Sequence, residues 1–379
     1  MNAYSYNPIP GSTILSGVSG KKAIVMAANV RIATVAEGIF KAAKDTDAAV
    51  FMELARSESD LKGGYTGMTP QVFGDKMRAA AAATGCDIWA LHADHISIKK
   101  GDSPEIAGTK DLIDAQVKAG YTSFAIDASH LFNFEGKNVR EELAENIAAT
   151  TELARYIKQQ MKGKDFGLEV EVGEIGRKDT EGLILTRPEE AVGFIKALNE
   201  NDVYPHVIAI ANGSSHGHAY DANGNVVEQL SIDINRTKEI AQALRDNHLK
   251  VGIAQHGITG TPRDHINLHF PKGDIIKGNV GTFWQDVAFG VLKIYEPDLY
   301  KSIVDWTLEK YRPANPGKKD RQVFDGNCKM AIKEFYKEIY AVDDATNKAM
   351  QAMAYAESLI FFRAFGAYGT ASVIRKSMH

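Results

Sequence analysis

Cysteine is scarce in this sequence, which has two in 379 residues, Cys86 and Cys328. Two isolated cysteines with no C-x-x-C pair exclude a disulfide framework and a cysteine-based zinc module. We therefore expect two reduced thiols, as in a cytoplasmic protein. Long apolar runs are also missing. No stretch approaches the roughly 18 consecutive apolar residues of a membrane-spanning helix, so none is predicted.

The chain also lacks a strong excess of charge. Its net charge is −4 with 24% charged residues, and basic pairs such as Lys99–Lys100 are short. This balance argues against the basic surface of a nucleic-acid or membrane-surface binder. The N-terminal segment MNAYSYNPIPGSTILSG has neither the basic start nor the continuous apolar run of a secretory signal. We therefore expect a cytoplasmic protein with no nucleic-acid and no membrane partner.

What the sequence does contain is a series of eight short apolar runs, separated by longer segments with helical periodicity. Near-continuous apolar runs are typical of strands that are buried on both faces of a parallel sheet. The clearest helical segment, 139–161, has apolar residues at three- and four-residue spacing. Other helices are predicted at 32–44, 70–84, 107–119, 188–199 and 232–247. The runs are Ala23–Ala28, Ala48–Met52, Ile88–Leu91, Ser123–Ile126, Gly167–Val170, Val207–Ile210, Val251–Ala254 and Asp274–Lys277.

Eight β–α units in one chain predict an α/β fold, a closed (β/α)8 TIM barrel, with a doubly wound open sheet as the alternative. Pro188 near a helix start and Gly120 just after a helix end agree with these units. After the eighth run the pattern is helical only. We therefore predict a barrel over residues 1–296. A C-terminal helical extension over residues 297–379 would pack on the barrel or on a neighbouring subunit.

Polar residues follow each apolar run. In a parallel barrel all strands end on one face, where barrel enzymes keep their catalytic residues, so these side chains are predicted to converge. Three of them, His95, His216 and His256, suit a zinc site with an open position. His218 is the alternative to His216, and Gly217 between them suggests backbone close to a ligand. The other polar residues are Asn29, Glu53, His92, Asp94, Asp127, Ser129, Glu171 and Asn279.

Glycine-containing turns follow the last two runs, HGITGT at 256–261 and KGNVGT at 277–282. Exposed backbone N–H groups in such turns bind phosphate oxygens. Barrel enzymes often bind phosphate at the loops after strands seven and eight. The two turns therefore predict a phosphate site.

At these residues the sequence resembles class II fructose-bisphosphate aldolases, in an ordered series of motifs over roughly residues 23–282. The motifs are HADHISIKK (92–100), FAIDASH (124–130), LEVEVGEIG (168–176), SSHGHAY (214–220), QHGITGT (255–261) and KGNVGT (277–282). Together they are specific, whereas any one of them alone is weak.

The resemblance implies that His95, His216 and His256 bind a catalytic zinc ion. It also implies that Asp94 moves a proton to or from the aldehyde-derived oxygen. Asp127 and Glu171 would form a second layer or an alternative metal position, which Ser129 helps to hold. Asn29 would contact the ketose hydroxyls, and a monovalent cation, Na+ or K+, would bind near Gly217. The residues implied to hold the phosphate of dihydroxyacetone phosphate are Gly217, Gly257, Thr259, Asn279 and Thr282.

Several positions depart from the family pattern. The last motif usually reads N-I-D-T, but Gly281 stands here in place of the aspartate. The mobile loop that carries a base glutamate offers Asp179 or Glu181, and the sequence leaves that choice open. Ala55 stands where a phosphate-contacting serine is common. The segment GGYTGMTP (63–70) resembles instead the accessory subunit of tagatose-bisphosphate aldolase.

The resemblance implies a lyase that reversibly cleaves a ketose bisphosphate, first of all fructose 1,6-bisphosphate, to dihydroxyacetone phosphate and an aldehyde such as glyceraldehyde 3-phosphate. Such a reaction belongs to glycolysis. Tagatose 1,6-bisphosphate or another acidic ketose 1-phosphate is the alternative substrate. A non-catalytic accessory subunit and a zinc hydrolase are the alternative functions. We expect a homodimer or homotetramer, in which Arg321, or failing that Arg312, of one subunit reaches the distal phosphate in the next.

Overall fold

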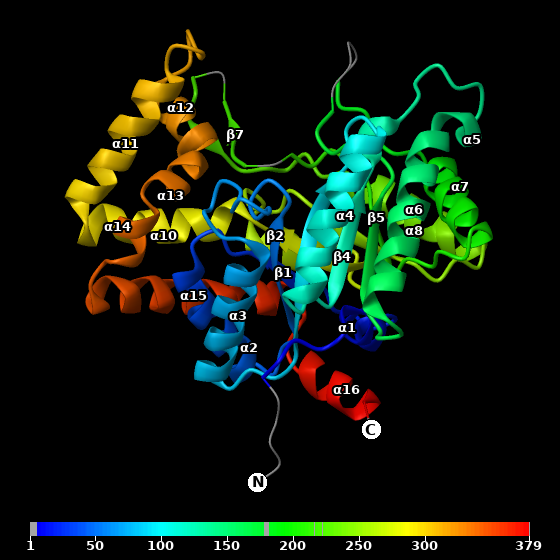
Figure 1. Ribbon diagram of the computed structural model, residues 1–379, viewed down its shortest axis with the longest axis horizontal. Coiled ribbons are helices and arrows are strands. Elements are labelled where there is room, and N and C mark those ends of the chain that lie inside the picture. The colour runs from blue at the N-terminus through cyan, green and yellow to red at the C-terminus, as the bar shows by residue number, and fades with distance from the viewer. Residues whose placement is uncertain (1–5, 178–181, 216, 222, 379) are drawn as a thin grey trace.

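Eight parallel strands form a closed barrel in the computed structural model, which describes residues 6–177, 182–215, 217–221 and 223–378 (Figure 1). β1 pairs with both β2 and β10 and so closes the ring. The predicted barrel is therefore confirmed over the open sheet, which would leave two unpaired edges. The strands are β1 (Val25–Asn29), β2 (Val50–Ala55), β3 (Trp89–Ser97), β4 (Ser123–Asp127), β5 (Gly167–Glu171), β6 (Val207–Ala209), β9 (Gly252–Gln255) and β10 (Ile275–Val280).

Each predicted apolar run overlaps one barrel strand, but several strands extend further toward the barrel mouth. Asp94 and His95 lie within β3, and Asn279 lies within β10, so these residues belong to strands and not to the loops that follow. The apolar pattern stops early because the last residues of these strands carry polar side chains that line a cavity. Hydrophobicity alone therefore underestimates strand length at the functional end of the barrel.

Helices surround the barrel at the predicted positions. The predicted helix 139–161 is interrupted at Leu143, which separates α5 from α6. Pro188 stands in the first turn of α7, and Gly120 has a φ of 84° just after α4, so both predicted boundaries are confirmed. The helices are α2 (Ala36–Asp45), α3 (Pro70–Thr84), α4 (Ser103–Lys118), α5 (Val139–Glu142), α6 (Ala144–Met161), α7 (Pro188–Glu200), α8 (Ile234–Asp246), α9 (Arg263–His269) and α10 (Thr282–Tyr295).

Two helices close the end of the barrel where the strands begin: α1 (Gly11–Val18), which the apolar pattern did not predict, and α16 (Thr370–Ser377) (Figure 1). The backbone N–H of Gly11 donates to the carbonyl of Thr122, directly before β4. Ile14 of α1 and Ile374 of α16 are fully buried in one cluster with residues of the strands. This plug leaves the opposite end of the barrel as the open one.

Within the described residues 297–378, the regular elements are helices and one 3-10 turn, as predicted. α15 packs so closely on α2 that a Cβ atom added at Gly38 would lie 2.1 Å from the carbonyl oxygen of Gln351. α11 and α12 stand beside the barrel mouth (Figure 1). The division of the chain at residue 297 stays a prediction. The remaining elements are α11 (Pro297–Tyr311), α12 (Asp320–Asn327), α13 (Ala331–Glu334), α14 (Tyr336–Tyr340), α15 (Asp344–Ala364), the 3-10 turns η1 (Ala33–Val35), η2 (Ser129–Leu131) and η3 (Cys328–Met330), and the paired strands β7 (Ala219–Tyr220) and β8 (Val226–Val227).

Among the helices of the described ranges, none combines the length and the apolar character needed to cross a membrane.

Candidate active site

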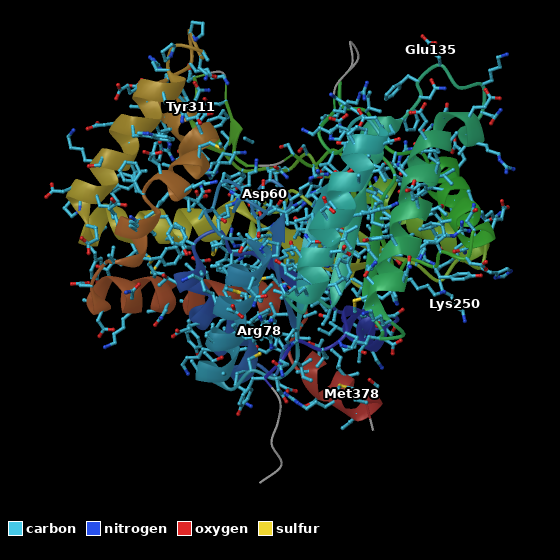
Figure 2. The ribbon with its side chains drawn as sticks, in the orientation of Figure 1. Asp60, Arg78, Glu135, Lys250, Tyr311 and Met378 are labelled. Carbon is cyan, nitrogen blue, oxygen red and sulfur yellow. The ribbon has the colours of Figure 1, made fainter. Side chains whose placement is uncertain are left out.

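A cavity of about 790 Å³ opens at the carboxyl ends of the barrel strands. Asp60 lies at this mouth, whereas Met378 lies at the closed end (Figure 2). Residues more than 250 positions apart in the sequence therefore share one wall, as the strand-end argument predicted. The predicted site residues that line the cavity are Asn29, Asp94, His95, Asp127, Ser129, Glu171, Gly217, His256, Gly257, Thr259, Asn279 and Thr282.

Three predicted site residues, His216, Asp179 and Glu181, lie outside the described residues. His218 lines the cavity, and its Nε2 lies 3.1 Å from Oδ2 of Asp286. The ring of His218 therefore already faces a carboxylate partner. His216 as a metal ligand, with His218 as the alternative, stays a prediction.

Arg321 is not part of the cavity wall in the described part of the chain. Its side chain is 68% exposed, and its Nε lies 3.4 Å from Oδ2 of Asp325. Arg312, the other candidate, pairs with Asp320 at 2.9 Å. A contribution of either arginine to a neighbouring subunit stays a prediction.

An irregularity in β3 brings two neighbouring side chains into the cavity. Successive residues of a regular strand point to opposite faces. His95 has a φ of 38°, in the left-handed region, and the pairing of β3 with β4 shifts register between Ala93 and Ile96. This bulge allows both Asp94 and His95 to line the cavity. Backbone strain at a histidine is costly, and such strain concentrates at functional sites.

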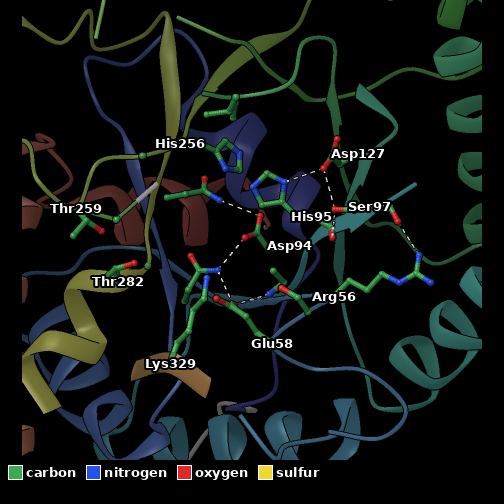
Figure 3. Close-up of a pocket in the computed structure, with 18 of the residues that line it drawn as sticks. Arg56, Glu58, Asp94, His95, Ser97, Asp127, His256, Thr259, Thr282 and Lys329 are labelled. Carbon is green, nitrogen blue, oxygen red and sulfur yellow. Dashed lines mark hydrogen bonds and ion pairs between the residues drawn. The ribbon is translucent and has the colours of Figure 1, made fainter. Parts of the chain in front are cut away.

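His95 and His256 face each other at the cavity floor, with ring centroids 4.5 Å apart (Figure 3). Nδ1 of His95 lies 3.3 Å from Asp127 and 3.2 Å from Glu171. Nε2 of His256 lies 2.8 Å from Oε1 of Glu169. Carboxylates in these positions fix the orientation and tautomer of a metal-binding imidazole. The carboxylates therefore occupy Nδ1 of His95 and Nε2 of His256.

Two groups of ligand-type atoms share His95. One combines it with Asp94 and His256, and the other with Asp127 and Glu171, each with ligand-type atoms within 4.8 Å of one another. Asp127 is also held by Ser129, whose hydroxyl donates to its Oδ1 at 2.6 Å. Ser129 thus contacts the second carboxylate layer that the resemblance implied.

Asp94 is buried between two side-chain amides. Asn29 Nδ2 donates to its Oδ2 at 2.9 Å, and Asn279 Nδ2 donates to its Oδ1 at 3.2 Å. Burial opposes ionisation of Asp94, but the charges of His95 and His256 outweigh it and hold its pKa well below the usual range. Asp94 is therefore an ionised, hydrogen-bonded carboxylate beside the two histidines.

A layer of charged side chains lies beneath the cavity floor, and the sequence reasoning assigned it no role. Lys277 Nζ is fully buried and lies 3.1 Å from Glu53 and 2.8 Å from Glu169. Burial and the Lys277 charge lower the pKa of His92, in the same layer, to about 3, so its imidazole is neutral. In the sequence, the signal for this buried layer was Lys277, a lysine at the end of an apolar run. Two glutamates at alternate positions of β5, Glu169 and Glu171, were a second signal, since both point to one face.

The predicted phosphate loops meet at the first turn of α10. Gly217 and Gly257 have φ values of 82° and 67°, in the region that favours glycine. A Cβ atom at Gly257 would lie 2.6 Å from the carbonyl oxygen of Ser215, so a larger residue does not fit. Thr259 accepts from the N–H of Phe283 at 3.3 Å. Gly281 and Thr282, at the N-terminus of this 14-residue helix, line the cavity, and a helix N-terminus favours an anion.

One wall of the cavity carries charged residues that the sequence reasoning missed. Arg31 Nε donates to Glu58 Oε1 at 2.7 Å, and its Nη1 donates to Thr282 Oγ1 at 3.2 Å. Lys329 of η3 and Tyr65 line the same wall. In the sequence, the only signals for this wall were the charged residues Arg31 and Glu58, shortly after β1 and β2, and Lys329 in the helical extension. Such residues are common on any protein surface.

Comparison with known proteins agrees with this geometry. The family description "Fructose-bisphosphate aldolase class-II" matches residues 11–348. The fructose-bisphosphate aldolase of Helicobacter pylori (strain ATCC 700392 / 26695) is 26% identical over 320 residues, covering 82% of this chain and 89% of its own length. That of Nostoc sp. (strain PCC 7120) is 25% identical over 272 residues, covering 67% and 66%.

Solved structures share the fold. A fructose-bisphosphate aldolase from Campylobacter jejuni has a TM-score of 0.62 at 17% identity, covering 96% of this chain and 97% of its own. The YdjI aldolase from Escherichia coli K12 has a TM-score of 0.59 at 17% identity, covering 96% and 99%. At these identities the structures support the fold, while the family match extends over most of the chain. The protein is a lyase that belongs to the class II fructose-bisphosphate aldolase family.

Proposed function

We propose that the protein is a zinc-dependent aldolase that reversibly cleaves a ketose bisphosphate to dihydroxyacetone phosphate and an aldehyde. Fructose 1,6-bisphosphate is the first substrate to test, with glyceraldehyde 3-phosphate as the aldehyde. The observation that carries the proposal is the grouping of Asp94, His95 and His256 in one cavity with the glycine-containing turns that follow β9 and β10.

The donor set fits a zinc ion, because imidazole nitrogens that are oriented by carboxylates are typical of catalytic zinc sites. We propose that His95, His256 and His216 hold the ion, with His218 as the alternative to His216. When bound, zinc supplies a Lewis acid that polarises the ketose carbonyl. Asp127 and Glu171 form a second layer or an alternative position for the ion, and Ser129 supports Asp127. We also propose that a monovalent cation binds near Gly217.

The remaining chemistry is proton transfer by carboxylates. Cleavage breaks the C3–C4 bond, and its electron pair passes to the triose phosphate half as an enediolate. The hydroxyl on C4 becomes the aldehyde, and its proton goes to Asp94, which is ionised and within reach of the cavity. A carboxyl group on the loop after β5, Asp179 or Glu181, which takes up a proton from solvent, then gives that proton to C3 and yields dihydroxyacetone phosphate, and Asp94 releases its proton to solvent.

The side-chain amide of Asn29 and the glycine-containing loops would orient the substrate. Asn29 uses its N–H groups on Asp94 and Glu58, so its Oδ1 is the atom available to accept from a ketose hydroxyl. We propose that Gly217, Gly257, Thr259, Asn279 and Thr282 hold the phosphate of the triose half. Holding both ends of the substrate lowers the entropic part of the barrier by several kcal/mol.

The test is a coupled assay on purified, zinc-loaded protein, together with metal analysis. We expect about one zinc ion per chain and release of dihydroxyacetone phosphate from fructose 1,6-bisphosphate. Faster cleavage of tagatose 1,6-bisphosphate, or of a ketose 1-phosphate with another acidic end, would change the substrate but not the reaction. Absence of zinc and of cleavage at every pH would favour an accessory subunit. Hydrolysis of phosphate esters without retro-aldol products would favour a hydrolase.

A glycolytic role, a cytoplasmic location and assembly as a homodimer or homotetramer are part of the same proposal. Gel filtration with light scattering tests the assembly, and an Arg321→Ala variant tests whether that residue serves a neighbouring subunit. An unchanged KM for the bisphosphate would remove Arg321 from the site.

A further inference from the structure

One buried lysine beneath the cavity floor has no part in the proposed chemistry. Lys277 is fully buried on β10, and its Nζ lies 3.1 Å from Oε2 of Glu53 and 2.8 Å from Oε2 of Glu169. Burial disfavours a charged ammonium, but the charges of Glu169 and Glu53 outweigh it and raise the pKa of Lys277. Buried ion pairs often stabilise a fold no more than apolar residues of similar size would, so stability alone does not account for Lys277.

The Lys277 ammonium fixes the side-chain amide of Asn279. Its Nζ donates to Oδ1 of Asn279 at 3.0 Å. An ammonium has no acceptor, so the oxygen of the amide must face Lys277 and the nitrogen must face away from it. That nitrogen, Nδ2, donates to Oδ1 of Asp94 at 3.2 Å and to Oε1 of Glu53 at 2.9 Å. Rotation of the amide by half a turn would instead place its oxygen against the carboxylate of Asp94.

The same ammonium is connected to a histidine of the candidate site through Glu169. One carboxylate oxygen of Glu169, Oε2, pairs with Lys277, and the other, Oε1, lies 2.8 Å from Nε2 of His256. The side chains of Glu169 and His256 are each only 2% exposed, so solvent does not compete for this contact. Two paths of contact therefore lead from Lys277, one to Asp94 and one to His256.

The position of Lys277 is that of a residue that acts through its neighbours. Within the described residues, the wall of the cavity includes Asp94, Asn279 and His256 but not Lys277. The ammonium lies below these side chains and does not reach a molecule bound in the cavity. Any effect of Lys277 on the reaction must therefore pass through the side chains that it holds.

We propose that Lys277 is a positioning residue for two functional side chains. It orients Asp94 through Asn279, and it orients His256 through Glu169. The inference rests on the proposed function, in which Asp94 accepts the proton of the C4 hydroxyl and His256 binds zinc. Without the ammonium, the amide of Asn279 loses the contact that determines which of its ends faces Asp94. Glu169 loses its cation and is free to turn away from His256. Cleavage and zinc affinity should therefore both decline, along separate paths.

The test replaces Lys277 with methionine, which has a similar length but neither charge nor N–H groups. Competition with a chelator of known zinc affinity measures the path through Glu169 without any need for activity. We expect Lys277→Met to bind zinc about 10-fold more weakly than wild type. Lys250→Met is the matched control, because Lys250 is exposed on the outer surface, and it should bind zinc within about twofold of wild type (Figure 2). An unchanged zinc affinity in Lys277→Met would overturn the path to His256.

The path through Asn279 is measured at saturating zinc. Cleavage uses Asp94, whereas deuterium exchange at C3 of dihydroxyacetone phosphate breaks no carbon–carbon bond and involves no C4 hydroxyl. We expect Lys277→Met to lower kcat for cleavage about 30-fold. Its KM and its rate of exchange should each change by less than about threefold. An equal loss of cleavage and exchange would indicate general distortion of the site and would overturn the path to Asp94, as would an unchanged kcat.

A double variant shows whether Lys277 acts through Asp94. In an Asp94→Asn background, Lys277→Met should lower kcat by a further factor of less than about three, because the side chain that it positions has already lost its function. A further loss of about 30-fold in that background would overturn the inference.

Two further comparisons keep the result decisive. If circular dichroism shows that Lys277→Met does not fold, Lys277→Met/Glu53→Gln removes the carboxylate left without a cation, and Glu53→Gln alone is then the reference. The same losses of zinc affinity and of kcat are expected from that pair. Wild type that neither cleaves nor exchanges would overturn the proposed function and with it the path to Asp94. The zinc affinity of Lys277→Met would still decide the path to His256.

Discussion

The buried carboxylate of Glu169 offers the sharpest test of the metal site. Glu169 is 2% exposed and contacts His256 on one side and Lys277 on the other, both at 2.8 Å. Glu169→Gln keeps the shape and one oxygen but removes the charge. The substitution therefore weakens the group that orients His256 and leaves Lys277 with Glu53 as its remaining carboxylate, at 3.1 Å.

We expect Glu169→Gln to lower both the free energy of unfolding and the affinity for zinc. Removing one partner of a buried ion pair costs about 3–5 kcal/mol. We expect the lower end, about 3 kcal/mol, because Glu53 still compensates Lys277. Removing a carboxylate that holds a metal-bound histidine costs about 10- to 100-fold in metal affinity. Gln can still accept from His256 Nε2, so we expect about 10-fold for Glu169→Gln and nearer 100-fold for Glu169→Ala.

Each loss has its own measurement. Urea unfolding of the metal-free protein measures stability, and competition with a chelator of known zinc affinity measures binding, neither of which needs activity. Glu145→Gln is the control, because Glu145 is exposed on α6 and far from the cavity wall. Zinc affinity within about twofold of wild type for both Glu169 variants would refute the orienting role. Glu169 would then serve only to balance Lys277.

Three further changes test a metal ligand, the proton acceptor and the contacts of α16. His256→Ala should lose zinc and activity while its circular dichroism stays that of wild type; full retention of zinc would mean that His256 is not a ligand. Asp94→Asn should bind zinc normally but cleave substrate at least about 100-fold more slowly in steady-state assays, and an unaltered kcat would remove Asp94 from proton transfer. Arg375→Met breaks contacts that α16 makes with Asp47 and Asp87, at 2.7 and 2.6 Å. Burial opposes ionisation of these carboxyls, but hydrogen bonds from Ser372 and then Arg375 hold the pKa of Asp47 below the usual range, and Arg375 does the same for Asp87. The contribution of about 1–2 kcal/mol to the free energy of unfolding should be present above about pH 4 and lost as the pH falls further; a difference from wild type that is the same at pH 3 and pH 7 would contradict it.

Much of the fold follows from local sequence properties. Residues 123–126 and 167–170 predict strands because they are short, apolar and bounded by helical periodicity, and both lie in barrel strands. α1 escaped prediction because it is only eight residues long and four of these residues are glycine or serine, which have low helix propensity. The interruption at Leu143 escaped it because apolar spacing continues across the break.

The candidate site was only partly predictable. Asp94 and His95 were found because they follow an apolar run, yet adjacent strand residues normally point in opposite directions. Only the bulge in β3 turns both into the cavity. Lys329 could not be found in this way, because nothing in its local sequence marks a residue of the helical extension as part of the barrel mouth.

The sequence by itself determined the barrel and the set of polar residues at its strand ends, because backbone periodicity and hydrophobic burial act over short stretches of chain. Tertiary packing alone decided which charges meet. Lys277 lies between Glu53 and Glu169 because β10, β2 and β5 enclose one interior. Lys329 reaches Tyr65 because η3 lies against the turn after β2. Electrostatic interactions depend on distance through space, and distances between residues 264 positions apart exist only once the chain has folded.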